Sequence, residues 1–186
     1  PVSREMPTLG TLAYTGSDCD EAMLTFFDAK RTAHRKRMLS TEYDKDHALD
    51  YMSPPVTYNS FLRKAVVHFS RYDLVRSLPR LSDGLKPGQR KALCFFLDRN
   101  IHAPVKVAQA GASAAQHTDY HHGETSMNNT IVVMAMERTG SNNIALLYPE
   151  GQFGSRAAAD CAANPRYIFT MLNEPVCSSI FSAKDT

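Results

Sequence analysis

The stretch PGQRKALCFFLD, residues 87–98, predicts a helix at the centre of the fold. Pro87 stands where a helix can begin, because proline lacks an N–H that the first helical turn leaves unpaired in any case. Leu93, Phe96 and Leu97 then follow at the spacing of one apolar helix side. The stretch therefore predicts an amphipathic helix that packs this side against a core.

Two further helices are predicted on either side of this one. Apolar residues recur at helical spacing over about 58–74, just after a pair of prolines at 54–55 that marks a boundary. Downstream, Ser126 can cap a helix over 127–139, and Gly140 follows as its terminator. Between these helices, the chain is only notable for being rich in alanine.

Two short apolar runs near the end of the chain predict strands. Residues 144–148 lie between polar and proline signals, and residues 167–172 are rich in strand formers. Helices followed by a pair of strands around a loop favour a winged helix-turn-helix. The predicted fold class is therefore α+β, mainly helical, with a short β wing.

Composition excludes several classes of protein. The chain has 186 residues, of which 43% are hydrophobic and 22% charged, which suits a globular domain with a core. Its four cysteines form no Cys-x-x-Cys pair, so neither a zinc knuckle nor a redox pair is indicated. Apolar runs are too short to span a membrane, and no signal peptide is visible. The chain begins with Pro1 rather than Met, which predicts that it was cut from a longer protein.

Positive charge is concentrated in residues 76–106, although the formal net charge of the chain is only +2. This stretch carries seven basic residues against two acidic ones, Asp83 and Asp98, a local balance of +5 (7 − 2). The basic residues are Arg76, Arg80, Lys86, Arg90, Lys91, Arg99 and Lys106. They predict a surface that faces phosphate groups, and a solvated helix face is the alternative. A second basic cluster, within residues 30–37, is typical of an exposed helix end.

Five blocks of sequence carry a resemblance to a known family. They are RSLPRLSDGLKPGQRK at 76–91, YHHGE at 120–124, GSNN at 140–143, GQFGSR at 151–156 and PRYIFT at 165–170. In this order and near this spacing, the blocks resemble the eukaryotic-type type IIA DNA topoisomerases. The resemblance is clear over about residues 76–175 and faint over residues 1–75.

The resemblance implies a DNA-gate segment with named catalytic residues. Tyr167 resembles the tyrosine that breaks and rejoins DNA, and Arg166 the arginine beside it. Arg76, Lys86 and His122 resemble the supporting phosphate contacts. Two domains are expected on this basis. Residues 1–57 would be the tail of a metal-binding TOPRIM domain with a linker, and residues 58–186 the winged-helix breakage-reunion domain.

The chemistry of these residue types agrees with that implication. A phenol can attack a phosphodiester and hold the broken end as a phosphotyrosine, so that cleavage is reversible. Tyrosine, with a free pKa near 10, needs help to lose its proton. Cations around Tyr167 would stabilise both a phenolate and the charge on the transferring phosphoryl group.

A wider set of residues is predicted to contact DNA. It comprises Arg76, Arg80, Lys86, Gln89, Arg90, Lys91, His121, His122, Ser155 and Arg156. Asp83 is expected to orient its basic neighbours. The resemblance further implies double-stranded DNA and a second copy of the parent enzyme as partners. It also implies Mg²⁺ held by TOPRIM residues and ATP held by an ATPase domain, both outside this chain, and no membrane.

One loop departs from the family pattern. Residues 157–166 are AAADCAANPR, where the eukaryotic pattern usually carries two glycines and a lysine and is one residue longer. Because Gly-to-Ala changes remove freedom at positive φ, this wing is expected to be stiffer or differently shaped. The divergence favours a protist or a large DNA virus as the source. The expected location is nuclear for a cellular protein and the host cytoplasm for a viral one.

Alternatives from other classes stay open. One is a non-catalytic winged helix that holds DNA through the basic stretch, with Tyr167 inert. Another is a dimerisation module that uses the helix over 126–139 as its surface. The His and Asp residues within 117–122 carry side chains that can ligate metals. Adjacent histidines point apart from most backbones, however, so no metal site is predicted.

Overall fold

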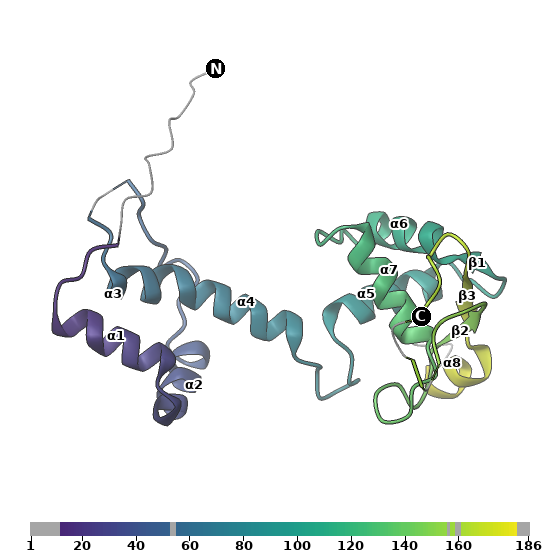
Figure 1. Cartoon of the computed structure of the whole chain (residues 1–186), viewed down its shortest axis with the longest axis horizontal. Coiled ribbons are helices and arrows are strands. Elements are labelled where there is room, and N and C mark those ends of the chain that lie inside the picture. Colours follow the sequence, from purple (N-terminus) through teal and green to yellow (C-terminus); the bar gives the residue numbers. More distant parts are fainter. Residues whose placement is uncertain (1–11, 53–54, 156, 159–160, 182–186) are drawn as a thin grey trace, which may run out of the picture. The chain divides into compact units, whose positions relative to one another are not determined.

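The computed structural model describes residues 12–52, 55–155, 157–158 and 161–181, shown as the coloured ribbon in Figure 1. The chain divides into two compact units, Pro1–Ser77 and Leu78–Thr186. The division therefore falls after the helix that begins at Tyr58, and not before it at residue 57. The names given above to the two expected domains stay predictions.

The first unit is helical in its described part (Figure 1). Its elements are α1 (Ser17–Phe27), a 3₁₀ turn (Ala29–Arg31), α2 (Thr32–Ser40), α3 (Tyr58–Phe61), a π-helical segment (Leu62–Val66) and α4 (Val67–Ser77). The last three follow one another without a break, which confirms the helix predicted over 58–74. Thr57 caps it, since its hydroxyl oxygen accepts the Ser60 N–H over 3.1 Å.

The second basic cluster serves the packing of these helices. Arg35 donates from Nη1 to the carbonyl oxygens of Thr25 and Asp28, over 3.1 and 2.6 Å, at the end of α1. Arg31 forms an ion pair with Glu21 on α1. A cation at a helix C-terminus satisfies carbonyl groups that the helix itself leaves unpaired. Part of the charge in this cluster is therefore engaged within the unit.

The second unit combines helices with a small sheet (Figure 1). Its elements are α5 (Pro87–Asp98), β1 (Val105–Lys106), α6 (Val107–His117), α7 (Glu124–Ala135), β2 (Leu147–Glu150), β3 (Phe169–Leu172) and α8 (Glu174–Ile180). The strands pair antiparallel in the order β1-β3-β2. The predicted α+β fold, mainly helical with a short β wing, is confirmed. The sheet has a third strand, β1, where only a pair was predicted.

The core of this unit joins α5, α7 and the sheet. Phe96, Met127, Ile131, Leu147 and Ile168 are all buried to below 2% exposure. Burying one such side chain contributes roughly 1.5–3 kcal/mol. The helix predicted over residues 87–98 is confirmed with these bounds, and its apolar side faces the core as expected.

The alanine-rich stretch forms α6, which packs closely against α7. Gly111 makes this approach possible, because a Cβ at this position would lie 1.8 Å from Oδ1 of Asn128 on α7. Small residues such as Ala110 and Ala114 line the same buried side of α6. The abundance of alanine thus reflects a tight helix–helix contact.

The bounds predicted for the next helix were wrong at its start. Helix α7 begins at Glu124 after Gly123, and the side chain of Ser126 does not cap it. Instead, the Ser126 hydroxyl forms a hydrogen bond of 2.9 Å with the hydroxyl of Tyr120. The pattern suggested a cap because serine is a good one, but here a tertiary partner takes its hydroxyl.

The predicted end of this helix was also wrong. Helix α7 ends at Ala135, well before Gly140. The Asn142 side chain donates from Nδ2 to the carbonyl oxygens of Met134 and Met136, over 3.0 and 2.8 Å. The GSNN block therefore closes the C-terminus of α7 with an asparagine amide, which satisfies carbonyls left free by the helix. Across the part of the chain that the structure describes, no helix is long and apolar enough to cross a membrane.

Candidate active site

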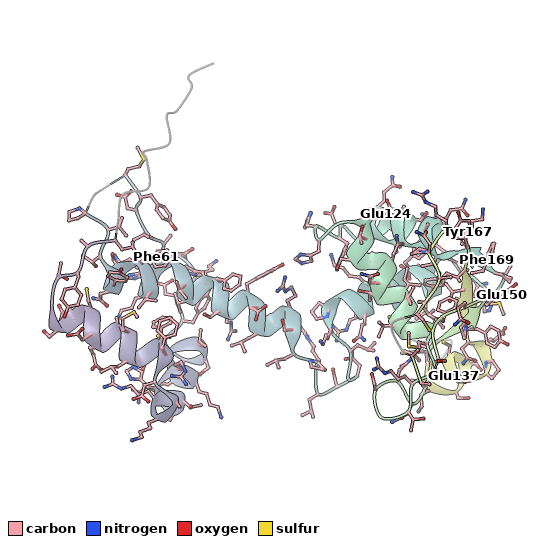
Figure 2. The ribbon with its side chains drawn as sticks, in the orientation of Figure 1. Phe61, Glu124, Glu137, Glu150, Tyr167 and Phe169 are labelled. Carbon is pink, nitrogen blue, oxygen red and sulfur yellow. The ribbon has the colours of Figure 1, made fainter. Side chains whose placement is uncertain are left out.

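Tyr167 lies on an exposed turn at the start of β3, with 75% of its surface accessible. Asn164 shapes this turn, since its Oδ1 accepts the Arg166 N–H over 3.1 Å and its carbonyl oxygen accepts the Tyr167 N–H over 2.9 Å. Arg166 is exposed as well. Figure 2 shows Tyr167 and Phe169 at the same edge of the second unit. The turn therefore offers a guanidinium and a phenol, side by side in sequence, to a ligand outside the chain.

The start of α6 fixes the main chain of this turn on both sides. Val107 and Ala108 donate their N–H groups to the carbonyl oxygens of Ile168 and Pro165, over 3.0 and 3.1 Å. The N–H groups of a helix's first turn lack partners within the helix, so they are free for this task. The backbone on either side of Tyr167 is thus held to a rigid element while its side chain stays exposed.

The GQFG block supports the turn from below. Gly151 has φ +108°, and a Cβ there would lie 3.0 Å from Cγ2 of Ile168. The carbonyl oxygen of Gln152 accepts the N–H of Ala163 over 2.8 Å, and Phe153 is buried. Sequence reasoning used this block only as a family marker and missed its role. Its two glycines around a phenylalanine are the signal that could have indicated a close backbone approach.

Asp83 pairs with one of the predicted DNA contacts. Its Oδ2 and Oδ1 accept from Nε and Nη2 of Arg90, each over 2.8 Å, in the two-pronged geometry of a strong ion pair. The N–H of Leu85 also donates to Asp83, over 2.9 Å. That backbone bond, and after it the Arg90 guanidinium, lowers the pKa of the Asp83 carboxyl. The expected orienting contact is present, and the part it plays in DNA binding stays a prediction.

Two other predicted DNA contacts meet at the start of α5. Gln89 accepts the main-chain N–H of Lys86 at its Oε1, over 2.9 Å, and so closes the first turn of the helix. The Arg80 main chain bonds to Leu85 and Gly84 within the preceding turn. Arg80, Lys86 and Gln89 therefore surround one helix start.

Lys91 points toward the end of α6. Its Nζ donates to the carbonyl oxygens of Thr118 and Asp119, over 2.6 and 3.0 Å, and lies 6.0 Å from the centre of the Tyr120 ring. The rings of Tyr120 and His122 meet edge to face, with centroids 5.2 Å apart. Lys91 and His122, both predicted DNA contacts, are thus joined through Tyr120.

The structure places these groups at opposite ends of α6 from Tyr167. The helix has 11 residues, which at 1.5 Å per residue is a length of about 16 Å. Val107 at its start holds the Tyr167 turn, and Lys91 bonds the carbonyls at its end. Within one copy of the chain, His122 and Tyr167 are therefore not brought together. A ligand that touches both must be at least as long as this helix.

The remaining predicted residues are less informative. Arg76 belongs to the first unit, where it pairs with Asp73 over 2.7 Å and lies 5.5 Å from the Tyr72 ring. His121 is exposed in the loop before α7, and Ser155 is exposed and accepts the Ala158 N–H at its Oγ. Arg156 lies outside the residues that the structure describes.

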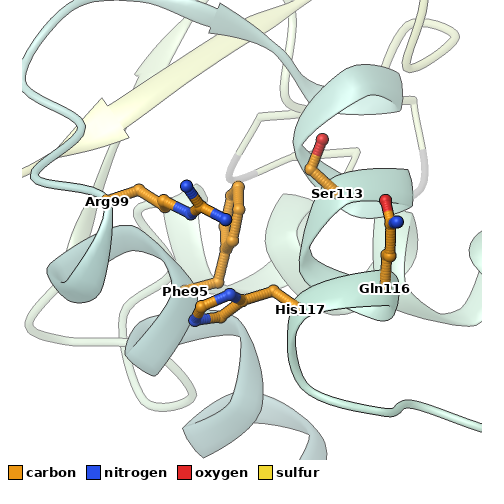
Figure 3. A pocket seen from close by; sticks show the side chains of 5 residues that line it. All are labelled: Phe95, Arg99, Ser113, Gln116 and His117. Atoms are coloured by element: carbon orange, nitrogen blue, oxygen red, sulfur yellow. The ribbon is translucent and has the colours of Figure 1, made fainter.

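A separate pocket opens between α5 and α6. It has a volume of about 540 Å³ and is lined by Phe95, Arg99, Ser113, Gln116 and His117 (Figure 3). Of the described residues that are predicted for DNA binding or catalysis, none lines it. Asp98 lies beside it, and the His117 hydrogen bond of 3.0 Å, followed by the Cys94 thiol, lowers the pKa of the Asp98 carboxyl.

Metal binding has no visible basis in the described part of the chain. Among those residues, no group of three or more histidine, cysteine, aspartate or glutamate side chains converges on a point that could hold an ion. The residues present thus do not fit the Mg²⁺ that the family resemblance implies. No chemical step at Tyr167 is derived through that ion.

The fold and the exposed Arg166–Tyr167 turn define a winged-helix-like domain built to present a tyrosine. Residues 76–186 match the protein family described as DNA gyrase/topoisomerase IV, in its A-type subunits. Because this match covers more than half of the chain, the chain belongs to that family, one of the type IIA DNA topoisomerases.

Similar proteins extend the likeness to most of the chain. The mitochondrial DNA topoisomerase 2 of Dictyostelium discoideum is 41% identical over 171 residues, which is 91% of this chain and 13% of that protein. Human DNA topoisomerase 2-alpha is 40% identical over 184 residues, which is 92% of this chain and 12% of that protein. The similarity thus reaches well before residue 76, where the motifs alone gave only a faint resemblance.

A solved structure shows the same fold. The DNA-binding, cleavage and re-ligation domain of Plasmodium falciparum topoisomerase II is 40% identical, with a TM-score of 0.67. The similarity covers 90% of this chain and 23% of that one. The chain therefore spans only a small part of the length of these relatives.

Proposed function

We propose that the chain is the DNA gate of an ATP-dependent type II topoisomerase, which breaks both strands of one duplex and passes another through the gap. Tyr167 is the residue that forms the covalent link. The observation that carries this proposal is the Arg166–Tyr167 turn, whose backbone α6 holds on both sides while the phenol remains 75% exposed. A nucleophile for a large polymer must be both accessible and fixed in place.

The proposed reaction exchanges one phosphate ester for another. The phenolic oxygen of Tyr167 loses its proton and attacks a backbone phosphorus, and the bond from phosphorus to the 3′-oxygen of the neighbouring sugar breaks. That oxygen leaves and takes up a proton, and the 5′ end stays attached as a phosphotyrosine. The reverse attack by the 3′-hydroxyl reseals the strand and releases Tyr167. Since one ester replaces another, resealing needs no added energy source.

Arg166 and the basic residues around α5 supply charge to this reaction. A guanidinium next to the phenol favours the phenolate and stabilises the negative charge of the transferring phosphoryl group. Lys86, at the start of α5, and Arg80 before it offer further contacts to the DNA backbone. Because His122 lies at the far end of α6 from Tyr167 in the same copy, we infer that His122 meets the duplex some base pairs away or meets the site of a second copy.

Cofactors and partners follow from the family. Type II topoisomerases need Mg²⁺ and ATP, and we propose that both are bound by parts of the complete protein outside this chain. We also propose that the complete protein acts on double-stranded DNA as a homodimer, since a double-strand break requires one tyrosine for each strand. The chain alone is expected to bind DNA weakly and to cleave it poorly.

The test is to trap the covalent complex in the complete protein. Denaturant added during the reaction with Mg²⁺ should leave DNA attached to the wild type and to Tyr148→Phe, a matched change at another exposed tyrosine. Tyr167→Phe should give no attached DNA, yet bind duplex within several-fold of the wild type. Attached DNA with Tyr167→Phe would refute the proposal. Duplex binding without any adduct in the wild type would instead support a non-catalytic binding or dimerisation module.

A further inference from the structure

The loop that carries His122 begins with an unusual backbone turn. Asp119 has φ +55°, a left-handed conformation that is mostly left to glycine. The next residue, Tyr120, donates its N–H back to the carbonyl oxygen of Ala115 over 2.9 Å. This is the bond that closes a helix through a left-handed residue just past its end. A non-glycine residue in this place needs support from elsewhere in the structure.

Lys91 on α5 provides that support. Its ammonium group donates to the carbonyl oxygens of both Thr118 and Asp119, over 2.6 and 3.0 Å. A cation at this position also faces the negative end of the α6 dipole. The side chain is half-buried, and two of the three ammonium protons point at carbonyl groups. Lys91 is therefore better placed to hold the turn than to contact a phosphate.

Tyr120 carries this support onward to His122. Its ring lies under the Lys91 ammonium at 6.0 Å, and its hydroxyl is held by Ser126 on α7 over 2.9 Å. Gly88 on α5 leaves room for the ring, since a Cβ there would touch Cε2 and the hydroxyl of Tyr120 at 3.7 Å. Three helices thus define the position of one phenol ring. The edge of the His122 ring meets it at an interplanar angle of 70°.

We propose that Lys91 and Tyr120 are positioning residues, which act on the reaction by fixing the His122 imidazole and not by touching DNA. This inference rests on the proposed function, because it gives His122 a part in DNA cleavage. It reassigns Lys91 from the predicted phosphate contacts and adds Tyr120, which the sequence marked only as part of a block. The carbonyl bonds of Lys91, the hydroxyl bond of Tyr120 and the ring contact together form one rigid connection from α5 to His122.

The decisive experiment is a double-mutant cycle on DNA cleavage by the complete protein at saturating DNA. Tyr120→Leu removes the ring, His122→Ala removes the imidazole, and the third variant carries both changes. If Tyr120 acts through His122, each single change lowers the cleavage rate about tenfold or more and the double variant is no slower than His122→Ala. Rate losses that multiply in the double variant would overturn the proposal, because a general structural role would give this result.

Conservative variants separate the ring from its hydroxyl. Tyr120→Phe keeps the ring beside His122 and should restore most of the rate lost in Tyr120→Leu. Lys91→Met keeps the aliphatic stem but frees the two carbonyls, and its rate loss should also vanish when His122 is already alanine. If Lys91→Met instead weakens duplex binding and lowers its salt dependence, Lys91 is a phosphate contact and the proposal fails for that residue.

A structural readout in the 186-residue chain makes the test independent of catalysis. The ring-proton NMR signals of His122 should shift in Tyr120→Leu, because the aromatic ring that faces them is gone. They should stay in place in Tyr148→Leu, a matched change at an exposed tyrosine on β2. Unmoved signals in Tyr120→Leu would refute the positioning contact. If the signals shift but His122→Ala cleaves normally, the contact exists and the role in cleavage fails, whereas Tyr167→Phe tests the proposed function separately.

Discussion

The N–H of Val107, the first residue of α6, donates to the carbonyl oxygen of Ile168, which directly follows Tyr167, over 3.0 Å. Two residues far apart in the chain thereby set where the nucleophile stands. Because Tyr167 itself is exposed, its side chain contributes little to holding its own backbone. Changes in the residues behind the turn should therefore affect the chemistry more than changes on its surface.

Val107→Pro should weaken this connection with little harm to the helix. Proline suits the first position of a helix, and Lys106 before it, at φ −57° and ψ 132°, already has the conformation that a residue before proline prefers. The lost hydrogen bond should cost about 1–2 kcal/mol and reduce the covalent adduct of the complete protein about tenfold.

Val107→Ala is the control for that change. It keeps the N–H but removes buried side-chain volume, so its stability loss should be of similar size, on the order of 1–3 kcal/mol, without an equal loss of adduct. Urea unfolding and denaturant trapping on both variants provide the comparison. Equal adduct yields from the two variants at equal stability would show that the Ile168 bond does not position Tyr167.

Gly151→Ala should destabilise the second unit and disturb the Tyr167 turn. The residue has φ +108°, and the added methyl carbon would lie 3.0 Å from Ile168. Gly140→Ala, at φ +88° with open space around it, is the control for backbone strain alone. Each should lose about 1–2 kcal/mol from the backbone, and Gly151→Ala should lose more, as measured by urea unfolding. Equal losses would mean that the Ile168 side chain yields without cost.

The stability of the second unit should fall in acid because of Asp83. Its pKa is lowered, first by the Leu85 N–H and then by Arg90, so the folded state favours the charged carboxylate. The stabilisation is present above the ordinary pKa of aspartate, near 3.9, and is lost as the pH falls through the lower folded-state pKa. Asp83→Asn keeps an oxygen for the Leu85 N–H and removes the charge. Thermal midpoints of the wild type and Asp83→Asn should converge between about pH 5 and about pH 3, and parallel curves would contradict this assignment.

Asn142→Ala should shorten or loosen the end of α7. Its amide bonds three carbonyl oxygens, those of Val133, Met134 and Met136. Their loss should cost about 1–2 kcal/mol of unfolding free energy. Asn142→Asp, which cannot donate to these carbonyls, should cost at least as much, whereas a change smaller than about 0.5 kcal/mol in both variants would show that water replaces the amide freely.

Much of the local structure could be predicted from the sequence because its causes are local. Pro87 and the apolar side of residues 87–98 are enough to place α5, and the strand formers before Leu172 place β3. Predictions at the two ends of α7 failed for one reason. Ser126 and Gly140 have the right chemistry for a cap and a terminator, but Tyr120 takes the hydroxyl of the first, and Asn142 closes the helix before the second.

By itself, the sequence determined the α+β class, the family and the identity of the exposed tyrosine, since these depend on residue types and their order along the chain. Tertiary structure alone decided that Val107 fixes the Tyr167 backbone, that Lys91 faces two carbonyl groups, and that α6 separates His122 from Tyr167. The physical reason is that each of these depends on a hydrogen bond, or on a distance, between groups from different elements. Such contacts are set by how helices and strands pack, and no spacing within a single element encodes them.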